Sequence, residues 1–553
     1  MPGCSLMKVY EAIANALREC GGGHLFGLMG DGNLRFLDYW VHSLEMPYFG
    51  SRHESAAIAM ADGFTRVSDT FAVATTTQGP GLTNALTALI AARKSQTPLV
   101  FVVGDVSSHQ QGWPQDIDHR ALFDAAGVPL VEIRDVGRAF SDTVQAVRTA
   151  IHDRTPIGIN MPVDIQELDW DPWNDDTGTT IEGRSLDFTG DLEVAANALA
   201  GAKRPVIIAG RGAVEAGCEA QLVELGNRIG ALYATTLKGK GLFQDHPFSL
   251  GICGGLGTNL QMTLIGQADA VLIVGAGMND FTTVRQTLMR PDAHVVRCDI
   301  SSEVSTANVG HEHVLTGNAA GSVAALLDRL TALEIASTGF RTPERAEELR
   351  TFRPESEIVF VGESDLIDPR ELVIMLNDVL PTQRNVVTDA GRFFGDPCSY
   401  MTIPDANAFV DGISFGSIGL GLGLSMGVAA ARSERPTVLF IGDGGLFMSL
   451  GELETAVRHD VSLLIVVMND SAYGSELQIS REWELPDDLT VFPERDFAAI
   501  ARGIGARSAS ARNLDQVRAA LEGVDLLQGP YLIDCTINPD ITARWLDDAF
   551  ERG

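Results

Sequence analysis

The chain has 553 residues, a length that predicts about three or four domains, each large enough to close an apolar core without disulfides or metals. Its 41 Lys and Arg stand against 73 Asp and Glu, a net charge of −32 without a basic cluster, which argues against nucleic acid or an anionic membrane as a partner. No apolar run reaches the roughly 18 residues of a membrane-spanning helix, and residues 1–22 lack a signal-peptide pattern, so we expect a cytoplasmic protein. The 7 cysteines are scattered and form no Cys-x-x-Cys pair, as expected of buried thiols in a reducing compartment.

Short apolar runs alternate with longer amphipathic stretches along the chain, a pattern typical of βαβ units with parallel sheets. The expected strands are Phe71–Thr75, Leu99–Val103, Val206–Ala209, Ala270–Val274, His294–Cys298, Val438–Ile441 and Leu463–Met468, and the clearest helices are Ser55–Thr65 and Leu446–Arg458. Two polar stretches, Asp169–Asp191 and Glu334–Asp368, are expected to hold the domain boundaries. The sequence therefore predicts an α/β protein of three doubly wound parallel-sheet domains, over residues 1–170, 190–335 and 365–553.

Two acidic residues stand out in the first unit. Glu54 precedes a helical run, at a position where the helix dipole favours an acid. Asp31 lies in Gly-Asp-Gly-Asn, a composition typical of a tight turn. By themselves, both residues also fit a purely structural role.

The middle unit has part of a dinucleotide-binding pattern. Val274–Gly277 follows an expected strand, and Asp299 ends a later strand 22 residues beyond Gly277, where a ribose-binding acid is expected. However, Asp280 occupies the position of the third glycine in Gly-x-Gly-x-x-Gly. This incomplete fingerprint disfavours an NAD-dependent dehydrogenase.

The third unit carries the strongest chemical signal. A strand leads into Gly442-Asp443-Gly444-Gly445, a second strand ends in Asn469-Asp470, and 24 residues lie between Gly444 and Asn469. That spacing accommodates one helix and a return strand, so Asp443 and Asp470 should meet at the carboxyl edge of a parallel sheet. Two carboxylates beside glycine amides at a helix start suit Mg²⁺ or Ca²⁺ that bridges a diphosphate.

This block resembles the thiamine diphosphate motif of the acetolactate synthase, pyruvate decarboxylase and benzaldehyde lyase superfamily. The family motif ends in two asparagines; here the second is Asp470, which keeps an oxygen ligand and adds a negative charge. The resemblance implies Mg²⁺ held by Asp443, Asp470 and the backbone carbonyl of Ala472. It also implies that Glu54 hydrogen-bonds N1′ of the cofactor's pyrimidine and so promotes the tautomer that deprotonates the thiazolium.

A third segment, Phe415–Gly419, resembles the same family. There, a bulky residue at the position of Ile418 bends the cofactor, and the carbonyl at Gly416 accepts from its 4′-amine. The resemblance further assigns to cofactor binding Gly391, Gly442, Gly444, Gly445, Tyr473 and Gly474. It implies a pyrimidine-binding domain over 1–170, a central domain over 190–335 and a diphosphate-binding domain over 365–553, with Glu54 of one subunit facing Asp443 of its partner. We therefore expect at least a homodimer and predict a homotetramer.

The candidate substrate-side residues resemble two branches of the family. Asp31 lies in a turn similar to that of the simple 2-oxoacid decarboxylases, whose aspartate lines the active site, and Glu476 follows the metal ligand by six residues as in those enzymes. Gln115 lies in a stretch similar to the one where acetolactate synthases and benzaldehyde lyase place an active-site glutamine, and His119 follows it. The consecutive double histidine of the decarboxylases is absent, which favours the carboligases.

The predicted function is a thiamine diphosphate- and Mg²⁺-dependent decarboxylation of a 2-oxoacid followed by carboligation to an aldehyde or ketone. The product would be of the acetolactate or 2-hydroxyketone type. One alternative is an enzyme of the 2-hydroxyacyl-CoA lyase or oxalyl-CoA decarboxylase type, for which a basic CoA-binding patch would be expected; a pyruvate oxidase-like enzyme with FAD is another. An alternative of a different class is a non-catalytic assembly or regulatory subunit that keeps the fold. For the central domain, FAD, ADP and no nucleotide all stay open.

Overall fold

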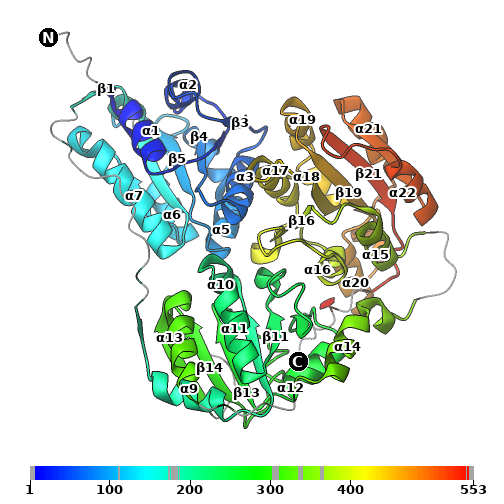
Figure 1. The fold of residues 1–553 in the computed structure, drawn as a ribbon. Helices are drawn as coiled ribbons and strands as arrows, with labels where there is room; N and C mark the ends of the chain where they lie inside the picture. The colour runs from blue at the N-terminus through cyan, green and yellow to red at the C-terminus, as the bar shows by residue number, and fades with distance from the viewer. Residues whose placement is uncertain are drawn as a thin grey trace. The chain divides into compact units, whose positions relative to one another are not determined.

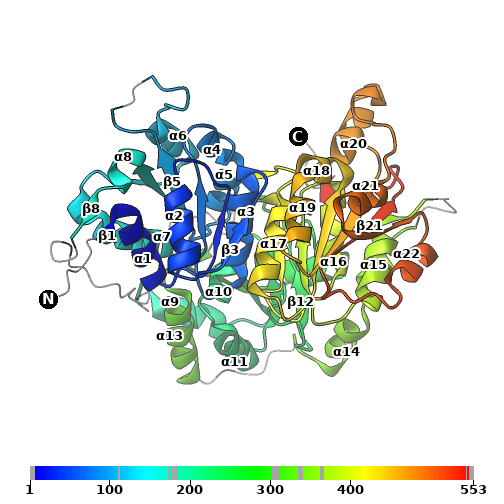
Figure 2. The same ribbon diagram turned by 90° about the horizontal axis from the view of Figure 1, so that it is seen from above.

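The computed structural model describes residues 7–109, 112–171, 175, 185, 187–301, 311–333, 335, 340–360, 366–542 and 545–546. Within them the strands form two six-stranded sheets, one seven-stranded sheet and the short pair β1 (Met7–Lys8) and β8 (Asp169–Trp170). The chain divides into two compact units. One comprises Met1–Glu182, Asn385–Gly391 and Val410–Ile537; the other comprises Gly183–Arg384, Arg392–Phe409 and Asn538–Gly553 (Figures 1 and 2).

The first sheet, in the order β3-β2-β4-β5-β7-β6, is parallel throughout. Its strands are β2 (Leu25–Gly27), β3 (Tyr48–Gly50), β4 (Val73–Thr76), β5 (Val100–Asp105), β6 (Leu130–Glu132) and β7 (Ile157–Pro162). Its main helices are α1 (Val9–Glu19), α3 (Glu54–Val67), α5 (Leu86–Lys94), α6 (His119–Ala126) and α7 (Ala139–Asp153). In β5, Val100 and Val102 join the apolar cluster of α1 and α7, whereas Phe101 and Val103 join that of α3 and α5. Helices thus cover both faces, which explains why these strands are apolar on both sides.

The sheet of the predicted third domain, called the third sheet below, has the order β17-β16-β18-β19-β21-β20. It belongs to the same compact unit as the first sheet. Its strands are β16 (Asn385–Thr388), β17 (Phe409–Asp411), β18 (Thr437–Gly442), β19 (Leu463–Asn469), β20 (Arg507–Ala511) and β21 (Pro530–Thr536). The prediction of one continuous helix over Leu446–Arg458 is wrong. Two short helices, α18 (Asp443–Met448) and α19 (Gly451–Arg458), replace it. The chain leaves helical geometry at Ser449, whose φ is −120° and whose hydroxyl, which can bend a helix by bonding back, donates to the Gly445 carbonyl oxygen at 3.1 Å.

The seven-stranded sheet has the order β12-β11-β10-β13-β14-β15-β9 and is mostly parallel. Its strands are β9 (Phe188–Thr189), β10 (Pro205–Ala209), β11 (Leu232–Thr235), β12 (Ser249–Ile252), β13 (Ala270–Val274), β14 (His294–Asp299) and β15 (His311–Gly317). The short edge strand β9 runs antiparallel to β15, a departure from the all-parallel prediction.

The α/β class and the doubly wound sheets are confirmed, and each expected strand is present with its ends shifted by at most two residues. The predicted boundary stretches fall partly on residues 172–174, 176–184, 186, 334, 336–339 and 361–365, which lie outside the described residues. The second stretch also contains a helix, α14 (Pro343–Thr351). In the part of the chain that the structure describes, no helix has both the length and the apolar character needed to cross a bilayer.

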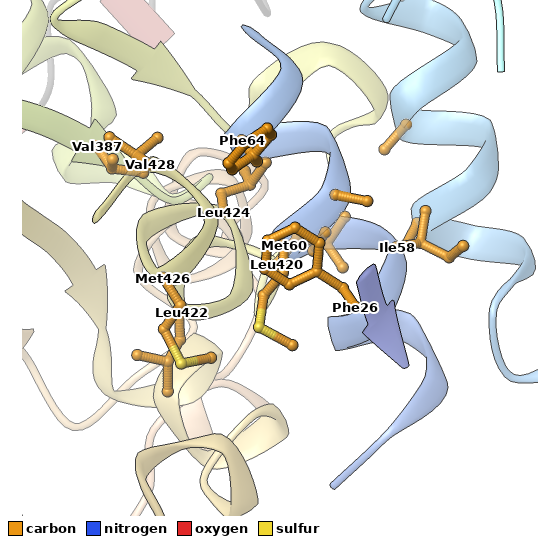
Figure 3. Close-up of a cluster of buried hydrophobic side chains, with 14 of the residues drawn as sticks. Phe26, Ile58, Met60, Phe64, Val387, Leu420, Leu422, Leu424, Met426 and Val428 are labelled. Carbon is orange, nitrogen blue, oxygen red and sulfur yellow. The ribbon is translucent and has the colours of Figure 1, made fainter. Parts of the chain in front are cut away.

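Helices α3 and α17 (Gly421–Ala431) cross with their backbones in direct contact, and Figures 1 and 2 show them side by side. A Cβ built on Gly63 would lie 2.1 Å from the Leu424 carbonyl oxygen, and one built on Gly427 would lie 1.9 Å from the Met60 carbonyl oxygen. Neither position has room for a side chain. Around the crossing, one apolar cluster runs from the first sheet to the third, as Figure 3 shows for Phe26, Met60, Phe64, Leu420, Leu424 and Met426. The two sheets therefore share a single core.

The crossing can be tested with Gly427→Ala. The added methyl group must push the α3 backbone away, so we expect the free energy of unfolding to fall by about 3 kcal/mol. The matched control is Gly503→Ala in α21 (Phe497–Ile504), where a built Cβ meets nothing within 4 Å. That variant should be neutral or stabilised by about 0.5 kcal/mol, because alanine is the better helix former. Urea unfolding followed by circular dichroism measures both. Equal stability of the two variants would contradict backbone contact at the crossing.

Candidate active site

Asp443 and Asp470 lie at the same edge of the third sheet, as their spacing predicts. Asp443 begins α18 directly after β18, and Asp470 directly follows β19, the parallel neighbour of β18. Burial, together with the charge of Asp470, raises the pKa of Asp443 to about 8. Its Oδ1 atom is buried and has no hydrogen-bond partner among the described residues. A buried carboxylate oxygen without a donor is costly, and a divalent cation would satisfy it.

The turn that follows β19 is fixed by Asn469. Its Oδ1 accepts from the backbone N–H of Ser471 at 3.2 Å, while its Nδ2 donates to Asp534 Oδ1 at 2.9 Å. Ser471 has a φ of +53°, a left-handed conformation that a non-glycine residue rarely adopts. Ala472 is buried and pairs with Val491. The strained turn therefore holds Asp470 and the Ala472 backbone in one geometry.

The glycine loop leaves no room for side chains. A Cβ built on Gly444 would lie 2.6 Å from the Tyr473 ring and 3.9 Å from Ile418 Cδ1, and one on Gly445 would lie 2.4 Å from Asp389 Oδ2. The structure thus brings together three segments that the sequence prediction assigned to cofactor binding. Of the other predicted glycines, Gly442 ends β18, Gly474 begins α20 (Gly474–Glu482), Gly416 follows a 3₁₀ turn (Ile413–Phe415), and Gly391 follows β16.

Asp389, which the sequence prediction missed, ties these segments to each other. It directly follows β16, is fully buried, and accepts from the backbone N–H groups of Gly419 at 2.7 Å and Gly421 at 3.1 Å. Burial raises its pKa to about 6, and the backbone N–H donors limit the rise. An acid directly after an apolar strand, in Thr-Asp-Ala-Gly, was the available signal.

A cavity of about 360 Å³ opens at this edge. Its walls are Asp443, Gly444, Phe447, Met448, Ser471, Tyr473, Phe492, Pro493, Arg495 and Phe497. Every lining residue comes from loops and helices of the third sheet. Its wall includes the Asp443 carboxylate and Gly444 at the start of α18, together with aromatic rings and the side chain of Arg495. This part of the wall can hold a cation and an anionic group next to each other.

Glu54 begins α3, and its surroundings hold it from two sides. Its Oε2 accepts from Asn84 Nδ2 at 3.0 Å. The two preceding residues, Arg52 and His53, donate their backbone N–H groups to Glu452 Oε1 at 3.0 and 2.8 Å. Glu452 is buried, and burial raises its pKa. The sequence prediction missed both Asn84 and Glu452, since no local pattern links either residue to Glu54.

The predicted substrate-side residues fall into two groups. Asp31 and Gln115 both bond to Gln78, so the structure brings these two together. His119 is 3% exposed and bonds through Nδ1 to Asn160 Oδ1 at 2.8 Å, whereas its Nε2 is buried without a hydrogen-bond partner among the described residues. Glu476 is exposed in the first turn of α20. Catalytic roles for these four residues stay predictions.

Three models of one protein family match the chain in order. They are the thiamine pyrophosphate enzyme N-terminal binding domain at residues 7–122, the central domain at 192–327 and the C-terminal binding domain at 389–535. The chain belongs to the thiamine pyrophosphate enzyme family. The N-terminal match contains Glu54, and the C-terminal match contains both Asp443 and Asp470.

Several named proteins are similar to the chain over nearly its full length. The chain is 27% identical to the probable acetolactate synthase large subunit of Methanocaldococcus jannaschii, over 96% of this chain and 92% of the relative. It is 27% identical to the acetolactate synthase isozyme 2 large subunit of Escherichia coli, over 96% of each. It is 28% identical to the sulfoacetaldehyde acetyltransferase of Rhodobacter capsulatus, over 99% and 97%. The protein is therefore a thiamine pyrophosphate enzyme that acts on carbon–carbon bonds.

Asp389 gives this thiamine pyrophosphate enzyme a testable pH dependence. Its pKa of about 6 in the folded chain exceeds the ordinary 3.8. As pH rises between these values, the unfolded chain loses the proton that the folded chain keeps. The contribution of Asp389 to the free energy of unfolding should therefore fall across that window, by on the order of 2 kcal/mol, and stay level above it. Asp389→Asn lacks this proton, so the wild-type-minus-variant difference in unfolding free energy should fall over the same window. Urea titrations at several pH values between about 4 and 7 measure it.

The matched control is Asp488→Asn, which removes an exposed carboxylate from the same compact unit. Its wild-type-minus-variant difference should not change with pH. If the Asp389→Asn difference is equally flat, Asp389 does not hold its proton in the folded chain.

Proposed function

We propose that the protein is a thiamine diphosphate- and Mg²⁺-dependent enzyme that decarboxylates a 2-oxoacid and joins the remaining carbon unit to a second carbonyl compound. The observation that carries this proposal is Asp443 Oδ1, a buried carboxylate oxygen without a hydrogen-bond donor. It lies beside Asp470 and at the start of a helix that opens with glycine amides. Structural carboxylates are paired or hydrogen-bonded, whereas a metal ligand must keep such an oxygen open.

In this proposal Asp443, Asp470 and the Ala472 carbonyl hold the Mg²⁺. Within the described residues, no group of three His, Cys, Asp or Glu side chains could hold a metal. The protein would supply two carboxylates and one carbonyl, and the cofactor's diphosphate and water would supply the remaining oxygen ligands that Mg²⁺ requires. Metal and cofactor binding should consequently depend on each other.

The bound cofactor supplies a thiazolium ring that accepts the electrons of a breaking carbon–carbon bond. The protein's own contribution is to place a carboxylate at the pyrimidine ring. Asn84 orients the Glu54 carboxylate, and Glu452 fixes the backbone just before it. In this orientation Glu54 would hydrogen-bond the pyrimidine N1′ of the bound cofactor.

We further propose that the active site forms between two subunits. All residues that line the cavity at Asp443 belong to the third sheet, whereas Glu54 belongs to the first. The family resemblance places Glu54 of one subunit against Asp443 of its partner. A homodimer is then the smallest active form, and a homotetramer is the expected assembly.

The names of the relatives favour an acetyl donor. Both names, acetolactate synthase and sulfoacetaldehyde acetyltransferase, refer to an acetyl-derived product or to acetyl transfer. Pyruvate is therefore the first donor to test, and the match to sulfoacetaldehyde acetyltransferases makes sulfoacetaldehyde the second candidate substrate. The net charge of −32 gives no support to a polyanionic CoA substrate.

The reaction can be tested by mass spectrometry of products after incubation with thiamine diphosphate, Mg²⁺ and pyruvate, with and without an added aldehyde. We expect acetolactate or a 2-hydroxyketone from the wild type. Glu54→Gln keeps the size of the side chain but not its charge, so turnover should fall about 100-fold or more while the cofactor still binds. A parallel incubation with sulfoacetaldehyde tests the second candidate. Near-native turnover of Glu54→Gln would contradict the role of Glu54.

The shared active site can be tested by mixing two inactive variants. Glu54→Ala lacks the pyrimidine-side acid, and Asp443→Asn lacks the metal ligand and should lose Mg²⁺-dependent cofactor binding in calorimetry. A mixed dimer contains one site with both residues intact, so subunit exchange at equal concentrations should restore about a quarter of the wild-type activity. Each variant alone serves as the control. If mass spectrometry detects mixed dimers but no activity returns, Glu54 and Asp443 act within one subunit.

A further inference from the structure

Gln78 joins the two predicted substrate-side residues of the first sheet. It lies after β4 and is 3% exposed. Its amide nitrogen Nε2 donates to Asp31 Oδ1 at 2.8 Å and to Gln115 Oε1 at 2.9 Å. Its oxygen Oε1 accepts from Thr77 Oγ1 at 2.6 Å. One buried amide therefore uses both of its N–H groups on these two side chains.

The chemistry of these partners fixes which way each amide points. An ionised carboxylate only accepts hydrogen bonds, so the NH₂ group of Gln78 must face Asp31. The second N–H of that group then requires an acceptor, so Gln115 turns its oxygen toward Gln78. As a result, two atoms can still form hydrogen bonds with a bound molecule: Nε2 of Gln115 as a donor and Oδ2 of Asp31 as an acceptor.

The loops around Gln78 are packed closely enough to hold this arrangement. A Cβ built on Gly32 would lie 1.8 Å from Gln78 Oε1, and one on Gly79 would lie 2.9 Å from the Cβ of Gln115. Asp31 itself is exposed and Gln115 is half-buried, so the fixed pair faces outward. Other carboxylates at this sheet edge bond elsewhere, since Asp105 accepts from Asn160 and Asp164 from Ser108.

We propose that Gln78 is a positioning residue that holds Gln115 as a hydrogen-bond donor beside an open oxygen of Asp31. The inference rests on the proposed function and specifies part of its substrate site. A donor next to a carboxylate complements a molecule that offers a carbonyl oxygen beside a hydroxyl group, as in a 2-hydroxyketone. Of the two product types named above it favours the 2-hydroxyketone over acetolactate, because Asp31 would repel the carboxylate of acetolactate.

Two variants of the full-length holoenzyme test this role. Gln78→Glu keeps the shape but sets a second carboxyl 2.8 Å from Asp31, so the pair must share a proton. The acidic limb of the kcat/KM profile should then move up by about 1 to 2 pH units. Gln78→Met removes the hydrogen bonds and frees Gln115, so KM for an added aldehyde should rise about tenfold with a smaller change in kcat.

Gln166→Met is the matched control. Gln166, at the end of α8 (Val163–Gln166), is also a buried glutamine, and its Nε2 donates to the Gly32 carbonyl oxygen at 3.1 Å. Its loss should lower thermal stability to a similar extent and leave the pH profile unchanged. Thiamine diphosphate binding, measured by calorimetry with Mg²⁺, should stay within about twofold of wild type for all three variants.

The outcomes separate this inference from the proposed function. If the wild type binds no thiamine diphosphate, the proposed function fails. If the cofactor binds but both Gln78 variants keep the wild-type pH profile and aldehyde KM, Gln78 is only structural and the inference is overturned. Loss of cofactor binding in both Gln78 variants, but not in Gln166→Met, would also overturn it, because Gln78 would then support the fold around the cofactor.

Discussion

The backbone contact between α3 and α17 is the constraint on which the site depends. Gly63 and Gly427 let the two helices approach until only backbone atoms separate them. Glu54 stands at the start of α3, and the segment with Ile418 leads directly into α17. A change in the crossing therefore displaces both predicted cofactor segments at once. The glycines allow the two helices to pack into one apolar core. That core fixes the positions of both predicted cofactor segments.

Buried polar side chains provide the second level of positioning. Asp389, Glu452 and Gln78 are each less than 4% exposed, and each accepts from or donates to segments distant in sequence. Their desolvation costs free energy, which is offset only while every bond is made. Such residues tolerate little movement of their partners. They turn loops, the mobile parts of most folds, into fixed supports for Glu54 and Asp31.

The sequence was informative where the signal is local. Apolar runs located the strands, and the rule that parallel strands share a carboxyl edge located Asp443 and Asp470 together. It was uninformative where function depends on contacts across long separations. Glu452 lies 399 positions from His53, and Gln78 lies 37 from Gln115, so periodicity contains no trace of either bond. The break at Ser449 was missed for a different reason, since the helical pattern of side chains continues across it while the backbone angles change at one residue.

Asp470 shows how a departure from the family motif changes the electrostatics of the site. An asparagine there would leave Asp443 as the only charge, whereas the second carboxylate contributes to the rise in its pKa, to about 8. Burial and the neighbouring carboxylate thus both oppose ionisation of Asp443. In the proposed function, a divalent cation held by Asp443 and Asp470 would balance their charges. Under the proposed function, a cation at this pair would offset the repulsion between the carboxylates and a diphosphate, so that metal and cofactor would favour each other's binding.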